Sequence, residues 1–278
     1  MIRLEARRLV DVTMRMLVAF AALLAIVPLA LILGFVVYRG AEGVDLALLT
    51  QLPRPVGQVG GGMAHAIVGT VVLLGLATVF ALPLGIAAAV YLAESPDRRL
   101  PGLVRFLADV LTGVPSIVVG LFAYAVVVVP TRRFSALAGG VALAVIMLPI
   151  VIRTSEEIIR LVPAALREAA LALGVPQWKA VLRIVLPAAR TGIVTGVLLA
   201  MGRVAGETAP LLFTAFGNQY WSRGVDEPIA ALPLQIFAYA SSPFEDWHRQ
   251  AWAGALVLIA LVFALDVVAR VVTRRRGE

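Results

Sequence analysis

Residues 167–187 read REAALALGVPQWKAVLRIVLP, the longest polar interruption with helical character in a strongly apolar chain. The stretch divides into two short helices. Pro163 suits the first position of the first helix, where its missing N–H costs nothing, and Gly174 permits a left-handed cap at its end. Pro176 then starts the second helix, and Pro187 ends it. The pattern predicts a compact helix–turn–helix.

Each of these short helices has one face of apolar or small side chains. On the first helix the face comprises Ala165, Ala169, Ala170 and Leu173; on the second it comprises Trp178, Val181, Leu182, Val185 and Leu186. An apolar face on a segment between long apolar runs indicates a surface that docks on another protein. An ordinary amphipathic linker is the alternative interpretation.

The composition is that of an integral membrane protein. Of the 278 residues, 61% are hydrophobic, and the mean hydropathy is +0.96. The chain has no cysteine and only two histidines, His65 and His248, so we expect neither thiol chemistry nor a metal site. No G-x-x-x-x-G-K-[ST] sequence is present, so we expect no ATP or other cofactor in this chain.

Six largely apolar runs are long enough to cross a bilayer at about 1.5 Å per residue. They are residues 16–38, 66–93, 107–129, 136–152, 191–216 and 251–272, with the polar connection at 153–190. A further apolar patch at 228–240 is too short to span and is expected to form a re-entrant or interfacial helix. The sequence therefore predicts one all-α membrane domain over residues 1–278.

The basic residues predict its orientation. Of the 24 Lys and Arg residues, 17 lie in the two termini and the connections at 94–106 and 153–190, against 6 on the other side. Basic loops stay in the cytoplasm, so we expect both termini and residues 153–190 there. Arg132 and Arg133 oppose this assignment. The net charge of +7 is explained by orientation, and we expect membrane lipid and no nucleic acid as partner.

Prolines occur inside five of the six predicted spans and favour kinked helices around a cavity. They are Pro28, Pro83, Pro115, Pro149 and Pro210. Such a cavity is typical of a transporter rather than of a rigid membrane anchor.

The segment GRVAGETAPLL places Arg203 and Glu207 inside the fifth span. An arginine twelve residues, or about 18 Å, into a helix lies near the bilayer centre, where it must face protein or water. Glu207 is four residues later, so the sequence predicts that both share one helix face and can pair. The pair is either structural or functional. In the functional interpretation, Arg203 offers a planar charged fork to an oxyanion, and Glu207 holds it or accepts a proton from the anion.

Hydroxyl groups near this pair are further candidates. Thr208 follows Glu207 directly, and Ser116 lies in the third span, so both could add neutral donors; bonding to their own helix backbone is the alternative. The adjacent carboxylates Glu156–Glu157 and Glu245–Asp246 point to different helix faces and are expected to be solvated. We therefore predict no catalytic residue and no enzyme activity in this chain.

Residues 167–187 resemble the EAA loop of ABC-importer permeases, in which EAA is followed by three residues, Gly, nine residues, Ile, any residue and Leu-Pro. The matching residues are Glu168, Ala169, Ala170, Gly174, Ile184, Leu186 and Pro187. In that family the loop inserts into a cleft on the ATPase subunit. The resemblance implies a type I importer permease with cytoplasmic coupling helices.

The segment around Arg203 is similar to the RxxGETAPL segment of phosphate-importer permeases of the PstA type. Three more stretches resemble the same family: LTGVPSIVVGLF (111–122), LPIVIRTSEEIIRLVP (148–163) and LPAARTGIVTGVLLA (186–200). The resemblance implies a multi-pass permease of the bacterial inner membrane that imports inorganic phosphate. It also implies a sister permease of the PstC type, two PstB-type ATPase subunits that hydrolyse ATP, and a PstS-type binding protein outside.

Two alternatives remain open at this point. The EAA loop does not distinguish phosphate from sulfate, molybdate or another polar solute, and only the RxxGET segment favours phosphate. A free-standing secondary transporter or channel, with Arg203 and Glu207 as its ion site, would leave residues 167–187, the predicted docking stretch, without a purpose.

Overall fold

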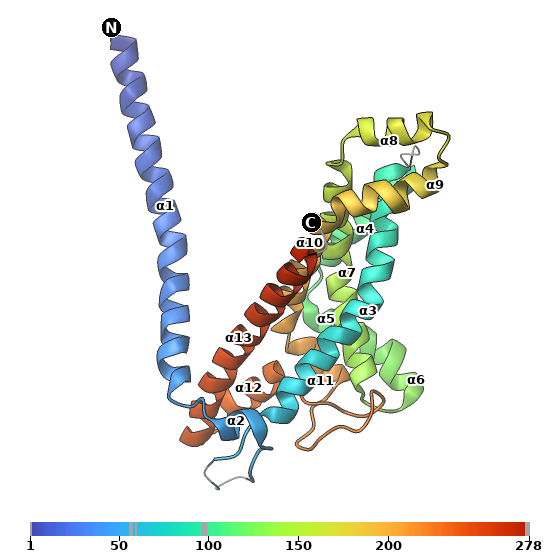
Figure 1. Cartoon of the computed structure of the whole chain (residues 1–278). Coiled ribbons are helices and arrows are strands. Elements are labelled where there is room, and N and C mark those ends of the chain that lie inside the picture. Colours follow the sequence, from blue (N-terminus) through green and yellow to red (C-terminus); the bar gives the residue numbers. More distant parts are fainter. Residues whose placement is uncertain (1, 56–57, 59, 96–98, 276–278) are drawn as a thin grey trace.

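The computed structural model describes residues 2–55, 58, 60–95 and 99–275, and their side chains from residue 10 to residue 271. Arg98 and Arg276, which entered the count of basic residues, lie outside the described residues. The described part of the chain is a bundle of helices without a β-strand (Figure 1).

Three helices form the centre of the bundle: α3 (Ala64–Glu94), α7 (Ala136–Arg160) and α10 (Leu186–Ala205). Helix α7 is the most deeply buried of the candidate membrane helices. Small residues allow it to approach its neighbours closely: a Cβ at Gly85 would lie 2.6 Å from Val151, and one at Gly192 2.6 Å from Ile158. Glycine on one helix therefore fits against a branched side chain on the next.

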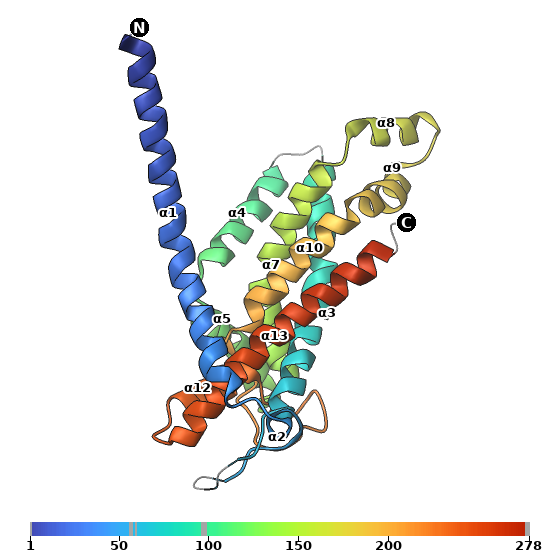
Figure 2. The same ribbon diagram turned by 60° about the vertical axis from the view of Figure 1, so that its left-hand side comes forward.

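Helix α1 (Ile2–Ala41) leans away from this bundle, as Figures 1 and 2 show. Within its apolar part, Val10–Ala41, no residue of the most apolar 18-residue segment is buried. The helix meets the rest of the chain at its C-terminal end, where Gly40 packs on Trp252 and Leu256 of α13 (Glu245–Arg275). The isolated chain therefore leaves a long apolar helix uncovered.

Among the described residues, five helices are long and apolar enough to cross a membrane, and a bent pair raises the number to six if it is counted as one span. The predicted spans at 16–38, 66–93, 136–152 and 251–272 lie within α1, α3, α7 and α13 respectively.

The predicted span at 107–129 is not one continuous helix. Helix α4 (Arg99–Gly113) ends before Pro115, and the chain resumes as α5 (Ser116–Ala123), the π-helix η1 (Tyr124–Val128) and α6 (Val129–Thr131) at a bend of 105°. Proline disfavours helical backbone in the residue before it, and it has no N–H to continue the helix.

The predicted span at 191–216 is also interrupted. Helix α10 ends at Ala205 with Gly206 as its C-cap, and the chain resumes as α11 (Ala209–Thr214). The proline ring at position 210 would clash with the carbonyl group of Gly206, four residues earlier, in a continuous helix. By contrast, α1, α3 and α7 continue through Pro28, Pro83 and Pro149.

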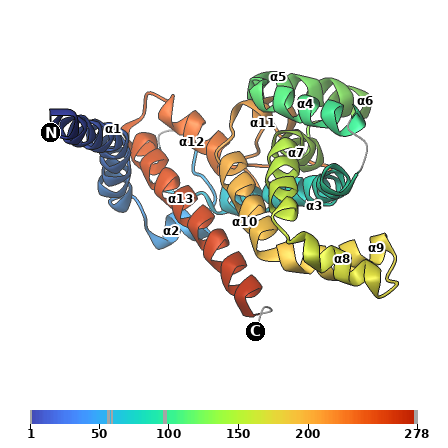
Figure 3. The same cartoon turned by 90° about the horizontal axis from the view of Figure 1, so that it is seen from above.

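The predicted docking stretch forms most of α8 (Ala164–Ala172) and all of α9 (Gln177–Ala180), which project from the bundle on the side away from α1 (Figure 3). Gly174 has a φ of +75°, as the left-handed cap requires. Pro163 and Pro176 are the residues that precede the two helices rather than their first helical residues.

The prediction that Pro187 ends the second helix is wrong. Helix α9 continues through a π-helical turn, η2 (Val181–Val185), into α10, and Pro187 lies in the first turn of α10. The Leu186 N–H donates to the carbonyl of Val181, five residues earlier, and this wider turn accommodates the proline ring.

Two short helices lie at the end of the bundle opposite α8. They are α2 (Leu46–Thr50), in a connection expected to have little secondary structure, and α12 (Leu232–Ala240), in the patch expected to form a short helix. Helix α1 begins and α13 ends toward the end that carries α8 and α9 (Figure 1). Both ends of the described chain therefore point to the side of the docking stretch.

Candidate functional site

A hollow of about 280 Å³ lies where α4, α5, α7 and the end of α10 meet. Its lining residues are Leu111, Thr112, Gly113, Val114, Pro115, Ser116, Val119, Ile146, Ile150, Arg203 and Glu207. Three of the four residues predicted for a substrate path, Ser116, Arg203 and Glu207, therefore line one space, although Ser116 is about 90 residues from the other two in the sequence. Thr208 follows Glu207 but does not line the hollow.

The hollow lies at two helix breaks that the sequence places far apart. The α4–α5 break supplies Val114 and Pro115, and Glu207 comes from the α10–α11 break. The two breaks are held together by close packing, since a Cβ at Gly120 of α5 would lie 2.6 Å from the Cα of Pro210. Non-helical backbone is tolerated inside a membrane where it lines a cavity, so both breaks support a polar site here.

Arg203 and Glu207 line the same hollow but do not pair. Among the side chains that the structure describes, no ion pair or hydrogen bond joins these two, and the prediction that they share a helix face is wrong, because α10 ends at Ala205. Arg203 is exposed and Glu207 is half-buried. The guanidinium group is therefore open to a ligand that enters the hollow.

Ser116 contributes more than a hydroxyl group, because it is the first residue of α5. The first amides of a helix have no acceptor within the helix, and the helix dipole places partial positive charge there. Val118 and Val119 donate back to the Pro115 carbonyl, so the first turn is well formed. The sequence analysis did not predict this helix terminus, because it treated residues 107–129 as one span; Pro115, which disfavours a continuous helix, was the available signal.

The residues of the predicted docking stretch lie mostly on the surface. Glu168, Ala169, Gly174 and Pro187 are exposed, Ile184 and Leu186 are half-buried, and Ala170 is buried. The expected apolar face of the second helix is divided, because Val181 and Val185 are buried whereas Trp178 is 61% exposed. Leu173 is 84% exposed. Helices α8 and α9 thus present uncovered apolar side chains to a partner.

Two charged residues of this region were not recognised from the sequence. Arg167 binds Glu94 at 2.9 Å and donates to the carbonyls of Ile159 and Val162, both at 2.8 Å. The expectation that Glu156 is solvated is wrong, because Glu156 is 2% exposed and its carboxylate binds three arginines. Glu157 is exposed, as expected.

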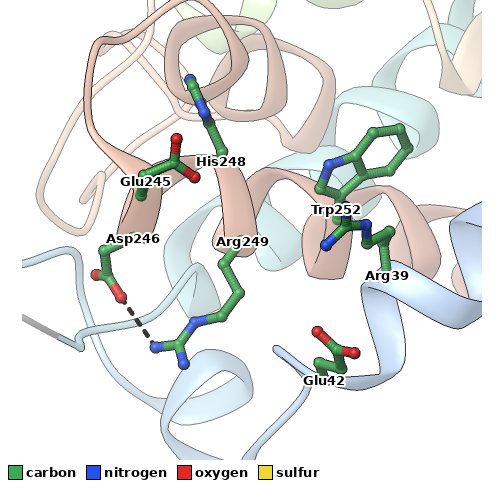
Figure 4. A pocket seen from close by; sticks show the side chains of 7 residues that line it. All are labelled: Arg39, Glu42, Glu245, Asp246, His248, Arg249 and Trp252. Carbon is green, nitrogen blue, oxygen red and sulfur yellow. Dashed lines mark hydrogen bonds and ion pairs between the residues drawn. The ribbon is translucent and has the colours of Figure 1, made fainter.

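A larger hollow of about 530 Å³ lies between the end of α1 and the start of α13 (Figure 4). Its lining residues are Arg39, Glu42, Glu245, Asp246, His248, Arg249 and Trp252. The lining has two arginines and three carboxylates, and Asp246 pairs with Arg249 at 2.9 Å. Asp246 also accepts from Gln250, so this carboxylate is structural rather than merely solvated.

The matches to known proteins agree with this architecture. Residues 81–278 match the family model described as binding-protein-dependent transport system inner membrane component. The chain belongs to this permease family. A phosphate transport system permease protein PstA from Yersinia pestis is 49% identical, covering 88% of this chain and 83% of its own length. The protein of the same name from Xylella fastidiosa strain 9a5c is 46% identical over 98% of this chain and 95% of its own.

Solved structures show the same fold. A chain of a bacterial ABC transporter involved in the import of the acidic polysaccharide alginate superposes with a TM-score of 0.62. It shares 16% identity, and the superposition covers 98% of this permease and all of that chain. This permease is therefore a multi-pass membrane protein with the fold of a type I ABC-importer permease.

Proposed function

We propose that this permease is the membrane subunit through which an ATP-driven, binding-protein-dependent importer moves inorganic phosphate. The observation that carries the proposal is the meeting of Arg203, Glu207 and the start of α5 in one hollow. The names of the relatives, which are phosphate transport permeases, support the choice of substrate.

Phosphate chemistry fits the donors in this hollow. Arg203 presents a planar fork of N–H groups that can bind two oxygens of one anion. The backbone amides at the start of α5 and the hydroxyl group of Ser116 add neutral donors at the positive end of that helix. Because the hollow is small and Arg203 is exposed, we infer weak and brief binding, as conduction requires.

Glu207 favours phosphate over sulfate. A carboxylate can accept a hydrogen bond from the hydroxyl group of HPO₄²⁻ or H₂PO₄⁻, but it only repels an anion without protons. Since Glu207 does not pair with Arg203 in this structure, its carboxylate can accept such a bond from the ligand.

The assembly that we propose follows from the uncovered surfaces. Two PstB-type ATPase subunits hydrolyse ATP, and one contacts α8 and α9 of this chain. A PstC-type sister permease covers α1, whose apolar part is bare in the isolated chain. A PstS-type binding protein delivers phosphate at the opposite end, beside α2 and α12. The location is the bacterial inner membrane, with both termini in the cytoplasm.

Transport in this proposal alternates between two states of the bundle. Closure of the ATPase pair on ATP moves α8 and α9. Because the chain continues from α9 into α10 through η2, that movement reaches the end of α10 that carries Arg203. The hollow is thereby opened to one side of the membrane and then to the other.

The test is uptake of radiolabelled phosphate in cells that depend on this system, with Arg203→Gln and Glu207→Gln compared with the unchanged protein. We expect both variants to reach the membrane at normal levels and to lose uptake. Excess sulfate should not compete with phosphate in the unchanged protein.

Two substitutions serve as matched controls. Arg132→Gln and Glu157→Gln remove the same charges from exposed residues that do not line the hollow, and we expect normal uptake from both. Normal uptake by Arg203→Gln and Glu207→Gln would contradict the site, and effective competition by sulfate would contradict the substrate.

A further inference from the structure

The carboxylate of Glu156 is the centre of a buried ionic cluster at the end of the bundle that carries α8. Its side chain is 3% exposed. Arg105 binds Oε1 at 2.7 Å, Arg160 binds the same oxygen at 2.8 Å, and Arg153 binds Oε2 at 3.3 Å. A buried carboxylate tolerates such a position only when it is paired, and here three cations contact it.

The cluster ties three helices together. Glu156 belongs to α7, whereas Arg105 belongs to α4 and also donates to the Leu92 carbonyl of α3 at 2.9 Å. Arg160 donates to the same carbonyl at 3.2 Å. One turn further along α4, Asp109 pairs with Arg153 at 3.2 Å, where both side chains are more exposed. Helix α4 is therefore attached to α7 by two ion pairs, of which only the Glu156 pair is buried.

The docking helix α8 is attached to the same place. Arg167 of α8 binds Glu94, two residues after Leu92 in the last turn of α3, and it also binds the carbonyls of Ile159 and Val162 at the end of α7. Charge-assisted bonds to three acceptors hold α8 firmly against α3 and α7. Helices α3, α4, α7 and α8 thus share one junction.

The other end of α4 lines the Arg203 hollow through Thr112 and Gly113. Arg105 and Gly113 are eight residues apart, or about 12 Å along the helix. A rigid α4 therefore reaches from the buried cluster to the hollow. Its neighbour along the chain, Ser116, starts α5 on the same hollow.

We propose that Glu156 is a positioning residue for transport. It fixes α4 to the body that α8 moves, so that displacement of the docking helix shifts the α4–α5 break beside Arg203. This inference rests on the proposed function, and it adds a second route to the hollow besides the direct connection from α9 to α10.

The test uses the complete transporter in proteoliposomes, where phosphate moved and ATP hydrolysed are measured together. Glu156→Gln keeps the shape of the side chain and removes its charge. We expect ATP hydrolysis to stay within about twofold, while phosphate moved per ATP falls by between roughly two- and thirtyfold, the range found for residues that carry coupling. The conservative Glu156→Asp should restore much of this ratio.

Two further variants keep the inference testable if Glu156→Gln does not assemble. Arg105→Gln removes the bonds from α4 to Glu156 and to the Leu92 carbonyl, and it should also lower the ratio. Glu157→Gln changes the exposed neighbour and should leave it unchanged.

The possible results separate the two proposals. An unchanged ratio in Glu156→Gln or in Arg105→Gln would overturn the role of the cluster. A parallel loss of ATP hydrolysis and transport at normal protein levels would also overturn it, because it would show a purely structural role. Failure of the unchanged transporter to move phosphate would instead refute the proposed function.

Discussion

The close packing of α5 on α11 gives a quantitative prediction for Gly120→Ala. A Cβ at position 120 would lie 2.6 Å from the Cα of Pro210, which is backbone and cannot rotate away. Ordinary contact begins at 3.4 Å, so the two helices must separate by about 0.8 Å, the difference between these distances. Helix α5 lines the hollow through Ser116 and Val119, and α11 begins two residues after Glu207, so we expect effects on stability and on transport.

The magnitude follows from the cost of overpacking. Inserting one methyl group into a tightly packed contact costs about 1–3 kcal/mol. At roughly 2–4 °C per kcal/mol for a chain of this size, the apparent Tm of the purified permease should fall by about 2–12 °C. Displacing a binding group by nearly 1 Å can cost as much as roughly a hundredfold in rate, so uptake should fall by more than about tenfold.

The assay pairs thermal unfolding of the purified complex with phosphate uptake. Gly75→Ala is the matched control, since Gly75 is exposed in α3 and a Cβ there meets nothing within 4 Å. Its Tm should be unchanged or slightly higher, because alanine favours a helix. A Gly120→Ala permease with unchanged Tm and uptake would show that α5 and α11 separate freely and would refute the argument.

Three further predictions concern the docking stretch and the hollow. Gly174→Val should cost more than about 1 kcal/mol at the positive φ and lower phosphate uptake, whereas Gly174→Asn should retain uptake because asparagine tolerates this backbone. Arg203→Lys keeps the charge but loses the planar fork, so uptake should fall less than in Arg203→Gln; equal loss would argue against two-oxygen binding. Arg167→Ala should release α8 and speed proteolytic cleavage there, whereas the exposed Arg183→Ala should not; equal cleavage rates would contradict the anchoring role.

Much of the secondary structure could be predicted because its causes are local. Hydropathy averaged over about 20 residues predicts the membrane spans that lie within α1, α3, α7 and α13. The left-handed cap at Gly174 follows from its missing side chain. The family was evident from the docking stretch and from the segment around Arg203, and the family match confirmed it.

The two spans that were wrongly predicted to be continuous contain a proline, and a proline either interrupts a membrane helix or is accommodated within it. Pro115 and Pro210 interrupt their helices, whereas Pro28, Pro83 and Pro149 do not, although each of these prolines lies in a largely apolar run. The outcome depends on what packs against the freed backbone. At Pro210 that neighbour is Gly120, which lies about 90 residues earlier in the chain.

The sequence by itself determined the long apolar helices, the pair of short helices around Gly174 and the presence of Arg203 and Glu207 in an apolar region, because each depends on residues within a few turns. Only the tertiary structure decided that Ser116 joins Arg203 and Glu207 at one hollow, and that Glu156 is buried while Glu157 is exposed. The physical reason is that the free energy of burying a charge is set by the partners that folding brings to it. For Glu156 the partner from another helix, Arg105, is 51 residues away in the chain.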